Sequence, residues 1–245
     1  MSTKTVVLVT GANQGIGFEI VKKLATDQKD YQIIAAGRRK SAIEEAVEKL
    51  HAVGLSSVSS LVLDVVSDES IASAVKEIES RYGRLDVLVN NAGISGDSSN
   101  SRADWKAVFD TNVAGVAAVT DACIPLMEKS VEADRPKRIV FVSSTLGSIS
   151  LKADPKAQTH ANLARTYTTS KAALNMLAWH YMVTYENDKN WKINCCCPGF
   201  CATNLNSYRG FDTPEQGAIR PSELATLGPD GPTATYSNRH GLVPW

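Results

Sequence analysis

Several features that would assign a function class directly are missing from this sequence of 245 residues. Lysine plus arginine and aspartate plus glutamate both total 26, so no surplus of charge indicates nucleic acid or an anionic membrane as a partner. No uninterrupted apolar run approaches the roughly 18 residues of a membrane span. The first residues contain no apolar signal segment, and we therefore expect a cytoplasmic protein.

Cysteines with the spacing of metal ligands are also missing. No C-x-x-C pair occurs, and three of the five cysteines, Cys195, Cys196 and Cys197, are consecutive. Neighbouring residues on a strand point to opposite faces of a sheet, so these three side chains cannot converge on one metal ion. We predict no metal site and interpret the cysteines as small apolar residues of a buried strand.

Apolar segments typical of buried strands alternate with amphipathic segments typical of helices. Strands are expected at residues 6–9, 33–36, 58–63, 87–89, 139–142 and 193–197, and helices near 15–26, 41–51 and 71–78. Strands this apolar are buried on both faces, as in a parallel sheet, and the strand–helix repeat requires right-handed crossovers. The sequence therefore predicts an α/β protein with a doubly wound, Rossmann-like parallel sheet flanked by helices.

No linker, repeat or low-complexity segment divides the chain, so we expect a single domain over residues 1–245. Residues 1–130 are expected to form its cofactor-binding half, and residues 131–245 its catalytic and substrate half. From Asn204 onward the regular pattern gives way to glycine, proline and polar residues. We expect irregular structure there, with one further strand at residues 233–236.

The first strand ends in a glycine-rich segment, residues 10–17, that fits T-G-x-x-x-G-x-G rather than the commoner G-x-G-x-x-G. Glycine lets the backbone approach a pyrophosphate closely, and the free N–H groups of the next helix attract the anion. A turn without a ligand would explain the motif in isolation, but its place after the first strand favours a nucleotide. The expected contacts are Gly11, Asn13, Gln14, Gly15, Ile16 and Gly17.

The residues after the second strand predict which nucleotide is bound. An NAD-binding protein carries an acidic residue about 20 positions after the glycine loop, whereas this chain has Arg38, Arg39 and Lys40. A guanidinium pairs well with a phosphate, so Arg38 favours NADP(H) as the cofactor. A solvated basic start to a helix is the alternative, and it explains Arg39 and Lys40 better than Arg38.

Further motifs follow in order, each near the end of a strand. They are N-N-A-G at residues 90–93, N-V-A-G at 112–115, two serines at 143–144, Y-T-T-S-K at 167–171 and P-G-F-C-A-T at 198–203. A tyrosine and a lysine four positions apart share one helix face, which alone is common. Together these motifs resemble the short-chain dehydrogenase/reductase family over nearly the whole chain. The family fold is a sheet of about seven parallel strands, and the sequence looks like the carbonyl-reductase branch.

This resemblance implies specific roles for residues of the motifs. Tyr167 is implied as the general acid/base, Lys171 as its partner and Asn112 as the anchor of a proton-relay water. Ser144 is implied as the hydroxyl that orients the carbonyl, because S-x-x-G then ends at Gly147, and Ser143 is the alternative. The implied cofactor contacts are Asp64, Val65, Asn90, Ala92, Gly93, Tyr167, Lys171, Pro198, Gly199 and Thr203.

The chemistry of these residues is that of carbonyl reduction. NADPH supplies a hydride, so the protein must supply a proton. Free tyrosine titrates near ~10, and we expect the ammonium of Lys171 to lower the pKa of Tyr167. The predicted function is NADP(H)-dependent reduction of a small ketone or aldehyde, whose identity and metabolic role the motifs leave open. The alternatives are an NADP-sensing protein without turnover, against which the Tyr–Lys pair argues, and a non-redox enzyme of this fold.

The gap between Ser144 and Tyr167 is longer than in most members of the family. We predict that the inserted residues 151–165 and residues 204–227 form a lid that sets substrate specificity, with a passive surface loop as the alternative. The insertion is close to the helices through which many relatives oligomerise, so we expect a monomer or homodimer rather than a tetramer. Packing rather than substrate contact is expected for Trp105, Phe200, Tyr208, Phe211 and Trp245, and a surface position for His160.

Overall fold

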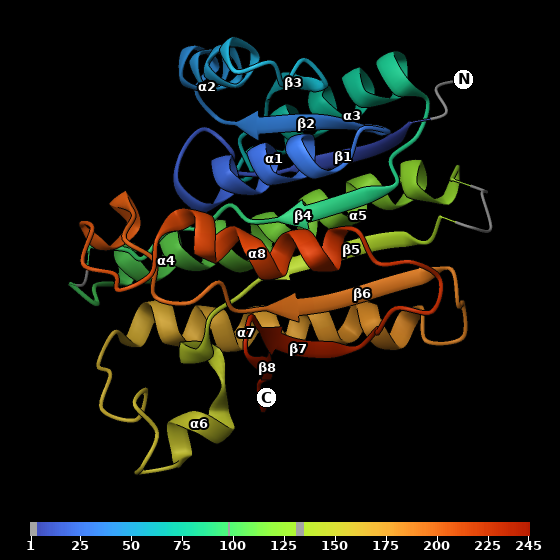
Figure 1. Ribbon diagram of the computed structural model, residues 1–245. Coiled ribbons are helices and arrows are strands. Elements are labelled where there is room, and N and C mark those ends of the chain that lie inside the picture. Colours follow the sequence, from blue (N-terminus) through green and yellow to red (C-terminus); the bar gives the residue numbers. More distant parts are fainter. Residues whose placement is uncertain (1–3, 98, 131–134) are drawn as a thin grey trace.

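A computed structural model describes residues 4–97, 99–130 and 135–245 (Figure 1). One sheet has the strand order β3-β2-β1-β4-β5-β6-β7-β8. Only β8 is antiparallel to its neighbour. The strands are β1 Thr5–Val9, β2 Tyr31–Gly37, β3 Val58–Val62, β4 Val87–Asn90, β5 Lys137–Val142, β6 Trp191–Cys196, β7 Thr235–Asn238 and β8 Gly241–Leu242. The predicted doubly wound α/β fold is confirmed, with a short antiparallel β8 added at one edge.

Helices cover both faces of the sheet. They are α1 Gly15–Asp27, α2 Lys40–Ala52, α3 Asp68–Tyr82, α4 Arg102–Phe109, the π-helical turn η1 Asp110–Ala114, α5 Gly115–Glu128, η2 Thr145–Gly147, α6 Ile149–Ala153, α7 Arg165–Thr184, η3 Asn204–Asn206 and α8 Pro214–Ala225. Apolar residues of α1, α2 and α8 pack in one core, and those of α3, α5 and α7 pack in the other. Val7 of β1 faces the first core and Leu8 faces the second, as the two-residue period of a strand requires.

The cysteines pack as the sequence analysis expects. Cys195 and Cys197 belong to the α3–α5–α7 core, and Cys196 belongs to the opposite core. All five cysteines are buried free thiols. Burial raises the pKa of Cys123 to about 12, so this thiol remains protonated and packs as an apolar group.

The helix α8 corrects the expectation of irregular structure after residue 204. Thr213 and Gln216 form a capping box at its start, with Pro214 at the first helical position. Gly217 and Pro221 inside the helix obscure the helical pattern in the sequence. Burial of one apolar face against the sheet compensates for these unfavourable residues.

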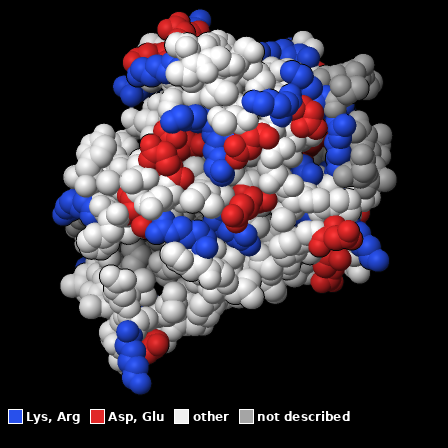
Figure 2. Space-filling model, viewed as in Figure 1, with Lys and Arg blue, Asp and Glu red and all other residues white. Residues whose placement is uncertain are grey.

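The helical stretch from Arg102 to Glu128 is long enough to cross a membrane, and an 18-residue window of it has a mean hydropathy of 1.3. The core helix of a globular domain meets the same two criteria, and 39% of that window is buried inside the structure. Val116, Val119 and Leu126 on its buried face pack in the core beneath the sheet. On the face shown in Figure 2, positive and negative side chains are intermixed rather than gathered by sign.

Candidate active site

A cleft opens at the edge of the sheet where the parallel strands end. The arrowheads of β2, β4 and β6 all point to this edge (Figure 1). The strand order reverses between β1 and β4, which is where α/β sheets bind their ligands. The cavity has a volume of about 780 Å³ and extends from the glycine loop and Arg38 to Tyr167 and Lys171. Its length therefore suits an extended dinucleotide better than a compact ligand.

The glycine loop between β1 and α1 has the backbone geometry of a phosphate cradle. Gly11 and Gly15 have φ values of 65° and 58°, which favour glycine. A Cβ atom at Gly17 would lie 2.4 Å from both the Gly11 carbonyl oxygen and the Asn91 side chain, so only glycine fits there. Gln14 provides no side-chain cap to α1, and the first N–H groups of this helix remain available to an anion.

The first two motifs of the sequence are joined by hydrogen bonds across β1 and β4. Asn91 Nδ2 donates to the carbonyl oxygens of Thr10 at 2.9 Å and Gly11 at 3.2 Å. In return, the Thr10 hydroxyl accepts from the backbone N–H groups of Asn91 and Ala92, both at 3.0 Å. Sequence reasoning did not identify Asn91 as a site residue, although it lies inside the N-N-A-G motif. Its role is to hold the glycine loop in place.

Most of the predicted cofactor contacts line the cleft. They are Gly11, Asn13, Gln14, Gly15, Ile16, Gly17, Arg38, Asp64, Val65, Ala92, Gly93, Tyr167, Lys171, Pro198 and Thr203. Asn90 and Gly199 do not line this cavity. The Asn90 side chain points instead to α5 and donates to the Thr120 hydroxyl at 2.9 Å. Gly199 has a φ of 94° and reverses the chain after β6, beside Asp212.

Tyr167 and Lys171 lie one turn apart on α7 and face the cleft. The Lys171 ammonium is 5.7 Å from the centroid of the Tyr167 ring. It donates to the Val142 carbonyl oxygen at 3.0 Å, which fixes it against the end of β5. The two side chains can therefore act on one reacting group at the end of the sheet.

Asn112 connects α7 to the loop that follows β4. It lies fully buried in the widened π-helical turn η1, a geometry that is common at functional sites. Its Nδ2 group donates to the Ile94 carbonyl oxygen at 2.9 Å and to the Ser170 hydroxyl at 3.0 Å. Its Oδ1 atom accepts from the Ile94 N–H at 2.9 Å. The Asn112 side chain therefore holds the Ile94 backbone and the Ser170 hydroxyl in position.

The two neighbouring serines after β5 have different surroundings. The Ser143 hydroxyl is buried and donates to Asn175 Oδ1 at 2.5 Å. Ser144 is partly exposed, and its hydroxyl accepts from the Leu146 N–H at 3.3 Å. The Ser144 side chain also acts to lower the pKa of the Tyr167 phenol. Ser143 lines the main cleft, whereas Ser144 is the serine that influences the pKa of Tyr167.

Two residues that sequence reasoning missed form hydrogen bonds with the serine turn, which comprises residues 143–147. Asn175 Nδ2 donates to the Gly147 carbonyl oxygen at 3.2 Å, so Asn175 contacts both ends of the turn. Tyr236 on β7 is almost fully buried, and its hydroxyl donates to the Ser144 carbonyl oxygen at 2.5 Å. Neither residue belongs to a motif, and Tyr236 is far from Ser144 in the sequence, so no local pattern reveals the contact.

The electrostatics of the pair differ from the sequence-based expectation. Burial raises the pKa of Tyr167 above its ordinary value, and the Cys197 thiol acts in the same direction. Burial also lowers the pKa of Lys171 to about 8. In this structure burial thus outweighs the groups that act to lower the pKa of the phenol, among them Ser144.

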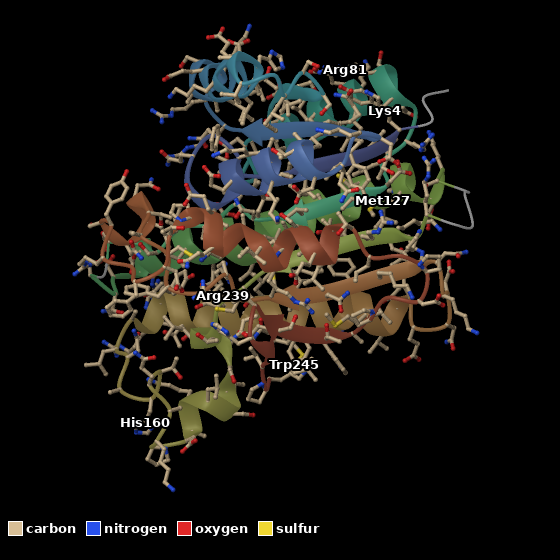
Figure 3. All side chains as sticks on the ribbon, viewed as in Figure 1. Lys4, Arg81, Met127, His160, Arg239 and Trp245 are labelled. Atoms are coloured by element: carbon tan, nitrogen blue, oxygen red, sulfur yellow. The ribbon has the colours of Figure 1, made fainter. Side chains whose placement is uncertain are left out.

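The insertion before Tyr167 has two parts. The distal part projects away from the sheet, with His160 at its tip (Figure 3). It is closed on itself, because Lys152 Nζ donates to the carbonyl oxygens of His160 and Asn162, both at 2.6 Å. Only residues 162–164 reach Tyr167, where they line a small second cavity. Of residues 204–227, Asn204 and Leu205 line the cleft, whereas α8 packs in the core and is no lid.

The aromatic residues divide into two groups. Trp105 packs 5.7 Å from Phe109, and Trp245 packs 5.2 Å from both Trp179 and Tyr236. Packing is thereby confirmed for these two tryptophans. Phe200 and Phe211 are 48% and 84% exposed but pack edge to face on each other, with ring centroids 5.6 Å apart, whereas Tyr208 is 71% exposed. They lie on the irregular segment that follows β6.

Comparisons with known proteins agree with this geometry. The family model for short chain dehydrogenase matches residues 5–212. The short-chain dehydrogenase anuI of Penicillium roqueforti is 39% identical over 231 residues, which cover 92% of this chain and 90% of the relative. The NADPH-bound carbonyl reductase from chicken fatty liver has a TM-score of 0.84 and 25% identity, with 99% of both chains covered.

A second solved structure, salutaridine reductase from Papaver somniferum, has a TM-score of 0.82 and 26% identity. The match covers 96% of this chain and 100% of the reductase. The glycine loop, the Tyr–Lys pair and Ser143 line one cleft on a sheet of the same kind. The resemblance read from the motifs is confirmed, and the chain belongs to the short-chain dehydrogenase/reductase family of oxidoreductases.

Proposed function

We propose that the protein reduces a ketone or aldehyde with NADPH, and that Tyr167 donates the proton. The observation that carries this proposal is the meeting of Tyr167, Lys171 and the glycine loop in one cavity. The NADPH-bound carbonyl reductase among the structural neighbours supports it.

The reaction follows from the positions of the side chains. Bound NADPH supplies the hydride. The Ser144 hydroxyl donates to the carbonyl oxygen of the substrate and fixes its orientation beside Tyr167. The Tyr167 hydroxyl then donates its proton to the same oxygen as negative charge develops there. Lys171 places a positive charge beneath the phenol ring, which stabilises the phenolate that remains.

The preference for NADPH rests on the far end of the cleft. Arg38 is exposed at its rim, and among the described residues it has no ion pair. A guanidinium in this position suits the additional 2′-phosphate of NADPH. Arg38→Ala should weaken NADPH binding by roughly 10- to 150-fold, the value of one charge-assisted contact, and leave NADH binding nearly unchanged. Equal losses for both cofactors, measured by fluorescence titration, would contradict this role.

The test of the function is consumption of NADPH with a panel of ketones, aldehydes and quinones. Tyr167→Phe should bind NADPH normally and lose more than nine tenths of the turnover, because only the phenol hydroxyl supplies the proton. Residual turnover above a tenth of the parent value would overturn the assignment of Tyr167. NADPH binding by the parent protein without turnover of any compound would favour an NADP-sensing protein instead.

A further inference from the structure

The small cavity beside Tyr167 has a volume of about 280 Å³, close to the lower limit for small-molecule sites. It shares Ser95, Asp104 and Tyr167 with the main cleft. A substrate whose carbonyl group meets Tyr167 therefore extends into this side chamber. We propose that Asp104 binds a hydroxyl group of the substrate there, so that the protein selects hydroxylated ketones. This inference rests on the proposed reductase function.

Asp104 is a buried carboxylate held by hydrogen bonds. It is 5% exposed and lies on α4, beside the start of α7 (Figure 1). Its Oδ1 atom accepts from the Asp97 N–H at 2.9 Å, and its Oδ2 atom accepts from the Thr166 hydroxyl at 3.0 Å. A carboxylate has about four acceptor sites, so Asp104 retains acceptor capacity beyond these two bonds, and the Asp97 carboxyl group also interacts with it. Among the described residues, no cation forms an ion pair with Asp104.

The rest of the chamber wall favours a neutral O–H donor over an anion. The described lining residues include no lysine or arginine, and a substrate carboxylate or phosphate would face the charge of Asp104 without compensation. An added O–H group, in contrast, forms a strong charge-assisted hydrogen bond with a carboxylate. Leu163 and Ala164 provide an apolar wall for the carbon frame of the substrate.

The other polar side chains of the wall, those of Ser95, Asn100, Asn162, Thr166 and Tyr167, are not carboxylates. The Ser95 hydroxyl donates to the Leu205 carbonyl oxygen at 2.9 Å. Asn162 Oδ1 accepts from the Ala164 N–H at 2.9 Å. Asp104 is the one carboxylate among the described lining residues and therefore the strongest acceptor for a hydroxyl group on the substrate.

A matched set of small ketones tests the inference. We would measure kcat/KM with NADPH for acetophenone, its three ring-hydroxylated isomers and the corresponding methoxy compounds. At least one hydroxylated isomer should exceed both acetophenone and its methoxy counterpart by about 10- to 100-fold, the range expected for one hydrogen bond to a charged group. Reduction of all the compounds without such a preference overturns the inference and leaves the reductase function intact.

Asp104→Asn isolates the charge of the acceptor. The amide oxygen can still accept from the Asp97 N–H, and the amide nitrogen can donate to the Thr166 hydroxyl oxygen. That hydroxyl can then turn toward Asn100 Oδ1, which lies 3.3 Å away. The preference for the hydroxylated isomer should fall below about threefold in this variant, since a neutral amide is a weaker acceptor.

Thr166→Val is the control for the internal hydrogen bond, because it removes the bond that Asp104 Oδ2 accepts and leaves the carboxylate in place. It should retain the preference; an equal loss in both variants would show that the effect is structural and overturn the inference. Leu163→Phe offers a second variant at an exposed position, 83% exposed, which fills the chamber from its wall. It should reduce the preference even if Asp104→Asn does not fold, and an unchanged preference contradicts the inference.

Calorimetric binding of the same ketones to the protein–NADP⁺ complex separates the two proposals. Tighter binding of a hydroxylated isomer by about tenfold, with no turnover of any ketone, would support the chamber and refute the reductase function. Equal binding of all the compounds would refute the chamber whatever the turnover.

Discussion

Lys171 combines a chemical role with a cost to stability. Its pKa of about 8 lies below the ordinary value of 10.5, because the ammonium is buried. Between these two pH values the unfolded state binds more protons than the folded state, so the stability of the folded protein rises with pH across that window. Below pH 8 the full penalty for burying the charge is present. A residue retained at such a cost is typical of an active site.

Lys171→Met should therefore remove the activity and stabilise the protein at the same time. The free energy of unfolding at pH 7 should rise by roughly 1 to 3 kcal/mol, with the lost hydrogen bond to Val142 offsetting part of the gain. Urea unfolding of the parent and the variant from pH 7 to 10 measures this directly. The difference should shrink toward the upper end of the range, and a variant that is less stable throughout would refute the account.

The two serines offer a comparison of identical substitutions at neighbouring positions. Ser144→Ala should lower kcat by about 10²- to 10³-fold, the usual effect of losing one oxyanion contact, without changing NADPH affinity. Ser143→Ala should leave the carbonyl contact intact and instead lower stability by roughly 1 to 3 kcal/mol, because Asn175 loses a buried partner. Steady-state kinetics and thermal unfolding of both variants decide the matter. The reverse pattern would make Ser143 the catalytic serine.

These residues also show where reasoning from the sequence ends. Tyr167, Lys171 and the glycine loop were predictable, because each lies in a motif whose spacing reflects a local structure. Asn175 and Tyr236 were not, because their contacts with the serine turn depend on the packing of α7 and β7. The direction of the Tyr167 pKa shift was also out of reach, since it depends on how deeply the assembled site is buried.

Among the elements, the insertion before α7 shows that a segment can border a site without covering it. Its distal part makes its hydrogen bonds internally, since the Lys152 ammonium holds the His160 and Asn162 carbonyl oxygens. The position of the insertion was predictable from the motif residues at its two ends, Ser144 and Tyr167. The outward direction of its tip was not predictable, because no apolar pattern in the sequence indicates which way the insertion points.

Replacement of residues 154–160 by two glycines should therefore leave the site working. We expect kcat/KM for every ketone to stay within about threefold of the parent value, since only residues 162–164 reach the cavities. Leu163→Phe, which alters that proximal part, should change the order of preference among the same ketones. A changed order in the glycine replacement itself would restore the entire insertion as a lid.

The strands were the most predictable elements, and α8 was the least. The apolar runs of β1, β4 and β5 are buried on both faces, which leaves little choice of structure. The helix α8 contains Pro221 and Gly217, so its sequence argues against the helix that the sheet stabilises. In this helix near the C-terminal end of the chain, burial against the sheet therefore outweighs the low helix propensity of the sequence.

On the scale of the whole molecule, the C-terminal residues connect the insertion to the serine turn. The Ser148 hydroxyl donates to the Pro244 carbonyl oxygen at 2.6 Å, and the Ser150 N–H donates to the Trp245 carbonyl oxygen at 2.9 Å. The Trp245 ring packs against Tyr236, whose hydroxyl holds the Ser144 carbonyl oxygen. Figure 3 shows Trp245 beneath the sheet, beside β8. Residues from the far end of the chain thus support the catalytic turn.

Trp245→Ala should therefore reduce both stability and turnover. The partly buried ring should cost roughly 1 to 3 kcal/mol of unfolding free energy when removed, less than a fully buried tryptophan. Release of Tyr236 should lower kcat severalfold, whereas NADPH affinity should be unchanged because the glycine loop lies on the other side of the sheet. Leu242→Ala is the control, since Leu242 is 78% exposed and should have neither effect. A kcat equal to that of the parent, with stability reduced as expected, would show that Tyr236 holds the turn without help from Trp245.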